Sequence, residues 1–216
     1  MSYETILFDV REQVATVTLD RPDVRNAFGA GMGPELDDAF RRCDEDDDIR
    51  AVVLTGTPPA FCSGADLVRG GETFGKVDTS TFNAAGLRFP PWDVRKPVIG
   101  AINGHCVGGG LEIALACDLR IARTNAGKVG LPEVSLGVLP GTGGTQRLGR
   151  AVGRAKAIEL MAEAATFGVE EAKALGLVNA VSMHPRASSV RGRWSTRASA
   201  SRRRKRRARS GSSSAR

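Results

Sequence analysis

The chain has 216 residues, of which 41% are hydrophobic and 25% charged, as is typical of a globular domain with a substantial core. No stretch approaches the length of a membrane-spanning helix, and the N-terminal segment lacks the features of a secretion signal. The four cysteines show neither CxxC spacing nor a matched pair of histidines, which argues against a metal centre and a disulfide framework. We therefore expect a cytoplasmic protein with reduced thiols and no bound metal.

The net charge of +7 is unevenly distributed along the chain. Residues 185–216 contain 12 Lys or Arg and no acidic residue, whereas the other 184 residues hold 19 basic and 24 acidic ones, a net charge of −5. In that basic segment only Val190 and Trp194 could contribute to a core, so it cannot offset the entropy of ordering. We predict a globular domain over residues 1–181 and a basic, disordered tail over residues 182–216.

The pattern of the globular part begins with strands and a helix. Polar and apolar residues alternate over residues 5–19 around Arg11-Glu12-Gln13, which predicts a β-hairpin. Residues 34–43 place apolar side chains on one face of a helix. The acidic residues that follow are unfavourable at a helix C-terminus, so this helix is predicted to end near Cys43.

Short apolar runs predict buried or extended strands further along the chain: residues 51–57, 96–102, 119–122 and 128–131. Residues 58–67 predict a turn and the start of a helix, and residues 70–91 show no period and predict a loop. Helical periodicity returns over residues 146–165, and residues 169–175 predict a short helix closed by Gly176. This alternation of strands and helices favours an α/β fold.

One stretch combines features of a functional site. Three glycines, residues 108–110, lead into an apolar helical run that carries a single carboxylate, Glu112. The free amides at the start of such a helix form an anion site, while glycines also allow a helix to pack closely on a strand. Both interpretations stay open. A carboxylate in so apolar a run must lie at the helix start, be paired or be protonated.

Four segments, in this order and at this spacing, resemble the enoyl-CoA hydratase/isomerase (crotonase) superfamily: FCSGADL, INGHCVGGGLEIALACDLRIA, GLPEVSLGVLPGTGGTQRL and AKALGLVNAV. The resemblance runs over residues 5–181. It implies a crotonase-like spiral of ββα units with a C-terminal helical part, assembled as homotrimers or hexamers. Because the family pattern is absent from residue 182 onward, we expect that helical part, which completes the acyl pocket and the trimer contacts in the family, to be largely missing or replaced.

The resemblance implies an enoyl-CoA hydratase, which adds water in syn fashion to a 2-enoyl-CoA and gives a 3-hydroxyacyl-CoA in fatty-acid oxidation. The substrate is an acyl-CoA thioester, and no cofactor is needed beyond the coenzyme A that the substrate carries. By motif match the catalytic acids are Glu112 and Glu133, and the oxyanion hole is formed by the amides of Ala65 and Gly109. Which glutamate acts as acid and which as base stays open.

Retention of both acids favours a hydratase over family members that keep one acid or none. Two alternatives are another crotonase-type enzyme, such as an enoyl-CoA isomerase, and an inactive protein that binds acyl-CoA or nucleic acid. The resemblance implies substrate binding by two turns and the first glycine of the triplet: Arg25, Asn26, Ala27, Ser63, Gly64, Asp66, Leu67 and Gly108. Arg25 could equally be a solvated surface residue. We expect four aromatic residues to border the acyl pocket: Phe74, Phe82, Phe89 and Trp92.

Other polar residues are given structural interpretations. His105 is expected to be packed and Asp118 to be a structural hydrogen-bonding acid at the end of its helix. Residues 62–64 do not form a G-x-S-x-G elbow, and the glycine-rich residues 141–144 fit neither phosphate-loop pattern. The basic tail has two interpretations: a frame-shifted end read from GC-rich DNA, or a basic arm that binds nucleic acid through its phosphates.

Overall fold

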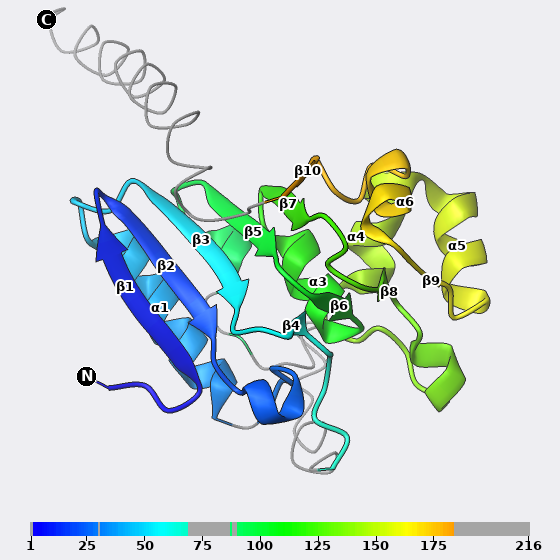
Figure 1. Ribbon diagram of the computed structural model, residues 1–216, viewed down its shortest axis with the longest axis horizontal. Helices are drawn as coiled ribbons and strands as arrows, with labels where there is room; N and C mark the ends of the chain where they lie inside the picture. The colour runs from blue at the N-terminus through cyan, green and yellow to red at the C-terminus, as the bar shows by residue number, and fades with distance from the viewer. Residues whose placement is uncertain (1, 30, 69–86, 88–89, 184–216) are drawn as a thin grey trace, which may run out of the picture.

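A computed structural model describes residues 2–29, 31–68, 87 and 90–183, and these form two sheets flanked by helices (Figure 1). The larger sheet has the strand order β1-β2-β3-β5-β7-β10. Its first pair is antiparallel and the other pairs are parallel. The strands are β1 (Ile6–Arg11), β2 (Val14–Leu19), β3 (Ala51–Gly56), β5 (Val98–Ile102), β7 (Leu119–Arg123) and β10 (Ala180–Ser182). The predicted α/β class is confirmed.

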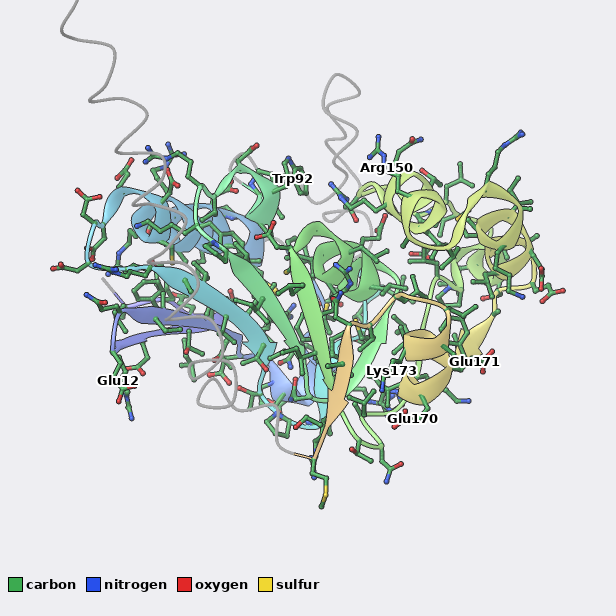
Figure 2. The ribbon with its side chains drawn as sticks, turned by 90° about the horizontal axis from the view of Figure 1, so that it is seen from above. Glu12, Trp92, Arg150, Glu170, Glu171 and Lys173 are labelled. Atoms are coloured by element: carbon green, nitrogen blue, oxygen red, sulfur yellow. The ribbon has the colours of Figure 1, made fainter. Side chains whose placement is uncertain are left out.

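The predicted hairpin is confirmed, with Arg11 paired to Val14 across a two-residue turn. Both turn residues, Glu12 and Gln13, have positive φ angles of 50° and 65°. A tight turn with this backbone matches the right-handed twist of the two strands it joins. Glu12 is labelled at this turn in Figure 2. Alternate residues of β2 are fully buried, so the hairpin covers the core with one face.

The smaller sheet has the strand order β4-β6-β8-β9. Its strands are β4 (Ala60–Cys62), β6 (His105–Val107), β8 (Val129–Gly130) and β9 (Thr166–Phe167). The first three are parallel, and β9 pairs antiparallel with β8. Of these four strands only β8 was predicted, as part of residues 128–131. The others were not recognised because a pattern of two or three residues is too short.

Helix α1 (Met32–Glu45) covers one face of the larger sheet beneath β1–β3 (Figure 1). It extends past the predicted end at Cys43. The buried carboxylate of Asp44 accepts a hydrogen bond of 2.7 Å from the Arg95 backbone amide and forms a 2.8 Å ion pair with its guanidinium. These contacts offset the unfavourable charge of Asp44 at the helix C-terminus. The helix was predicted to end too early because Arg95, the cation that pairs with Asp44, lies far away in the sequence.

The C-terminal half places α4 (Gly144–Val152), α5 (Arg154–Ala162) and α6 (Val169–Ala174) on the far side of β7 (Figure 1). The helical periodicity of residues 146–165 corresponds to two helices, α4 and α5, because Gly153 interrupts the helix with a φ of +84°. The predicted closure of α6 is confirmed: Gly176 has a φ of +80° and its amide bonds to Lys173 O at 3.0 Å.

The remaining elements are helix α3 (Gly109–Ala116) and three 3₁₀ turns, η1 (Pro22–Val24), η2 (Pro91–Asp93) and η3 (Glu133–Leu136). Most of the predicted loop 70–91, Phe74, Phe82 and Phe89 within it, and residues 184–216 of the predicted tail lie outside the described residues. Within the described part, every helix is too short or too polar to cross a membrane.

Candidate active site

The glycine triplet between β6 and α3 serves two purposes. Gly108 turns the chain into the helix with a φ of +55°. At Gly110 a Cβ atom would lie 2.2 Å from the carbonyl oxygen of Cys62, so only glycine lets α3 approach β4 this closely. Gly109 and Gly108 line a pocket. The packing interpretation therefore applies to Gly110, and the site interpretation to the two glycines before it.

Glu112 lies in the first turn of α3 with 3% of its surface exposed. Its Oε1 accepts hydrogen bonds from the amides of Thr142 at 2.8 Å and Gly144 at 2.7 Å, and its Oε2 accepts one from the Thr142 hydroxyl. The glycine-rich residues 141–144 are thus an anion cradle, although the anion is a carboxylate of the same chain. This contact could not be recognised from the residue types, because backbone amides supply most of its hydrogen bonds.

Glu133 begins η3, just after β8, and is 9% exposed. Its Oε2 atom is buried and has no hydrogen-bond partner among the described residues. Burial, with a smaller contribution from the charge of Glu112, raises the pKa of Glu133 to about 7. A carboxyl group with this pKa exchanges a proton readily near neutral pH.

Two residues that line the same pocket have free backbone amides. The amides of Ala65 and Gly109 donate to no acceptor among the described residues, although the neighbouring amides of Asp66 and Leu111 do. A Cβ atom on Gly109 would lie 3.8 Å from Ala65 N, which shows how closely the two segments approach. Two free amides in one cavity can stabilise an oxygen atom on which negative charge develops.

The pocket is lined by both glutamates and both amides and has mostly apolar walls. It contains about 950 Å³ of space, part of it open to solvent. Its apolar lining includes Phe28, Leu87, Trp92, Ile113, Leu136 and Leu139. Trp92 was among the aromatic residues expected here. The site can therefore hold an apolar chain beside two acids and a pair of free backbone amides.

The predicted substrate-binding residues separate into two groups. Ser63, Gly64, Leu67 and Gly108 line the pocket, whereas Arg25, Asn26, Ala27 and Asp66 do not. The fully buried Asn26 donates to Thr57 O and Ala60 O, both at 2.8 Å, and Asp66 forms a 2.9 Å ion pair with Arg21. Asn26 and Asp66 thus support the turn that carries Ala65.

Other candidate groups lie outside this chemistry. His105 is exposed rather than packed, and its Nδ1 accepts a hydrogen bond from the Lys128 amide at 3.1 Å. Burial raises the pKa of the Cys62 thiol to about 11, so it is a poor nucleophile. Asp118 is confirmed as a structural acid, because it accepts a 2.8 Å hydrogen bond from the Val98 amide. No metal-binding cluster of His, Cys, Asp or Glu occurs among the described residues.

The chain is similar in sequence to a known enzyme family. Residues 9–202 match the family described as Enoyl-CoA hydratase/isomerase, a range that extends past residue 181, so the predicted domain boundary stays a prediction. A probable enoyl-CoA hydratase of Mycobacterium leprae is 43% identical over 84% of this chain and 70% of its own. The short-chain-enoyl-CoA hydratase of Clostridium acetobutylicum is 39% identical over the same shares.

Solved structures agree with the sequence relatives. An enoyl-CoA hydratase from Mycobacterium tuberculosis H37Rv superposes with a TM-score of 0.75 at 35% identity, over 90% of this chain and 82% of that one. A second, from Geobacillus kaustophilus, gives a TM-score of 0.72 at 38% identity, over 83% and 69%. The crotonase-like fold is thus confirmed for the described residues, and the chain belongs to the enoyl-CoA hydratase/isomerase family.

Proposed function

We propose that this protein is an enoyl-CoA hydratase, a hydro-lyase that adds water to the 2,3 double bond of a 2-enoyl-CoA. The observation that carries the proposal is the meeting of Glu112 and Glu133 with the free amides of Ala65 and Gly109 in one apolar pocket. Relatives about 40% identical are named for this activity. The product is a 3-hydroxyacyl-CoA, as in fatty-acid oxidation.

The amides act on the thioester carbonyl. As the water oxygen bonds to C3, electrons move through C2 onto the thioester oxygen and an enolate forms. The N–H groups of Ala65 and Gly109 donate to that oxygen and stabilise its charge. Because they are fixed by β4 and α3, they need little reorganisation as the charge develops.

The two acids handle the protons. One carboxylate accepts a proton from the attacking water, and the other acid delivers a proton to C2 on the same face, which gives syn addition. A proton then passes from the carboxyl group that accepted it from water to the one that donated to C2, and both acids regain their initial protonation states. The raised pKa of Glu133 favours it as the donor, while Glu112, fixed by three hydrogen bonds, orients and deprotonates the water.

The wider assignments follow from family membership. We propose an acyl-CoA thioester as the substrate, no cofactor beyond the coenzyme A it carries, a homotrimer or hexamer and a cytoplasmic location. Light scattering after size-exclusion chromatography tests the assembly. Both acids are retained, which favours hydration over isomerisation, and product analysis separates the two reactions.

The decisive experiment follows the loss of crotonyl-CoA absorbance with the purified full-length chain. Hydration by the wild type, abolished in both Glu112→Gln and Glu133→Gln, supports the proposal. A folded wild type that binds crotonyl-CoA without hydrating it contradicts the proposal and favours an inactive acyl-CoA-binding protein.

A further inference from the structure

Arg147, on the inner side of α4, contacts the cradle that holds Glu112. Its Nη1 donates a 2.7 Å hydrogen bond to the carbonyl oxygen of Thr142. That carbonyl belongs to the peptide unit between the two amides, Thr142 N and Gly144 N, that bind the Glu112 carboxylate. Arg147 therefore fixes the middle of the segment whose two ends hold the acid.

The other side of the Arg147 guanidinium is covered by the pocket wall. Its Cζ lies 4.1 Å from the centroid of the Trp92 ring, a cation–π contact. Trp92 lines the pocket from η2, and Figure 2 labels it there. The guanidinium thus lies between the pocket wall and the cradle, with one contact to each.

From these contacts, and resting on the proposed hydratase function, we infer that Arg147 is a positioning residue for Glu112. It does not line the pocket: its hydrogen bond reaches Glu112 through the Thr142 peptide, and its positive charge also interacts with the Glu112 carboxylate. Stacking on Trp92 restricts the orientation of its planar guanidinium, so the hydrogen bond to Thr142 is preorganised. Loss of Arg147 would let residues 142–144 move and shift the carboxylate they bind.

Such a displacement acts on the chemical step rather than on binding. A misplacement of about 1 Å in a catalytic group lowers a rate on the order of 100-fold. Since the cradle retains its other contacts, we expect Arg147→Met to lower kcat roughly 10-fold or more, with KM changed less than about twofold. Arg147→Lys keeps a charged donor without the planar group and should recover part of kcat.

The matched control is Arg150→Met, which removes the same charge from an exposed side chain on the same helix (Figure 2). It should leave kcat and KM unchanged. An unchanged kcat in a folded Arg147→Met variant of an active enzyme would overturn the inference, as would an equal loss in Arg150→Met.

A double-mutant cycle measures the same coupling without turnover. The midpoints of urea unfolding are compared for full-length wild type, Glu112→Gln, Arg147→Met and the double variant. Because both residues act on one segment, their effects on the midpoint should be non-additive, whereas Glu112→Gln with Arg150→Met should be additive. Additivity in the Arg147 cycle overturns the inference whether or not the protein hydrates crotonyl-CoA. A wild type without hydratase activity overturns the proposed function alone.

Discussion

The buried carboxyl of Glu133 makes a quantitative prediction about stability. Its pKa is raised from 4.5 to about 7, chiefly by burial. At about 1.4 kcal/mol per pKa unit, ionisation of Glu133 then costs the folded protein about 3 kcal/mol. Because the folded state keeps this proton to a higher pH than the unfolded chain, the loss of stability is absent below pH 4.5, grows up to pH 7 and is complete above it.

Glu133→Gln replaces the group with a neutral one of the same shape. The free energy of unfolding of the variant relative to the wild type should therefore increase by about 2 kcal/mol between pH 5.5 and pH 8.5. An unpaired polar atom of the new amide adds an offset independent of pH, which cancels in this comparison. The variant is expected to be more stable than the wild type at high pH and to lack hydratase activity.

Urea unfolding followed by circular dichroism at the two pH values gives these free energies. The control is Glu170→Gln, which removes an exposed carboxylate from α6 (Figure 2) and should shift stability equally at both pH values. If the difference between Glu133→Gln and wild type is the same at pH 5.5 and 8.5, the argument from burial is refuted.

Three further predictions concern the surroundings of the pocket. Asn26→Ala removes buried hydrogen bonds to Thr57 O and Ala60 O and should lower the free energy of unfolding by about 3 kcal/mol. The control Arg25→Ala changes an exposed side chain and should lower it by less than about 0.5 kcal/mol. Urea unfolding measures both variants. Trp92→Ala widens the apolar wall and should raise the ratio of kcat/KM for octenoyl-CoA over crotonyl-CoA about 10-fold; an unchanged ratio would place the acyl chain elsewhere. All four thiols are buried, so a thiol reagent should label none in the folded protein and all four in guanidinium chloride; rapid labelling of native Cys62 would contradict its raised pKa.

Elements with a local signal could be predicted from the sequence. The hairpin was recognisable because its alternation and turn lie within one short stretch. The closure of α6 was recognisable because Gly176 directly follows its last apolar residue. The break at Gly153 was missed, since the apolar periodicity continues across it and a single glycine is tolerated in many helices.

Features that depend on distant partners could not be predicted. The end of α1 was placed too early because Asp44 is neutralised by Arg95, which lies 51 residues away. The family motifs identified Ala65, Gly109, Glu112 and Glu133 as candidate site residues, and all four line one pocket in the structure. The same motifs contain the glycine-rich cradle, yet its role depends on backbone amides that meet Glu112 about 30 residues away.

The close approach of α3 to β4 at Gly110 sets the spacing of the two free amides. Ala65 follows the end of β4, and Gly109 is the first residue of α3. The distance between the two donors is therefore fixed by how near the helix comes to the strand, and Gly110 sets that limit through its contact with Cys62 O. Gly110 does not line the pocket but acts as a spacer, and any side chain added there would widen the gap that, in the proposed mechanism, receives the thioester oxygen.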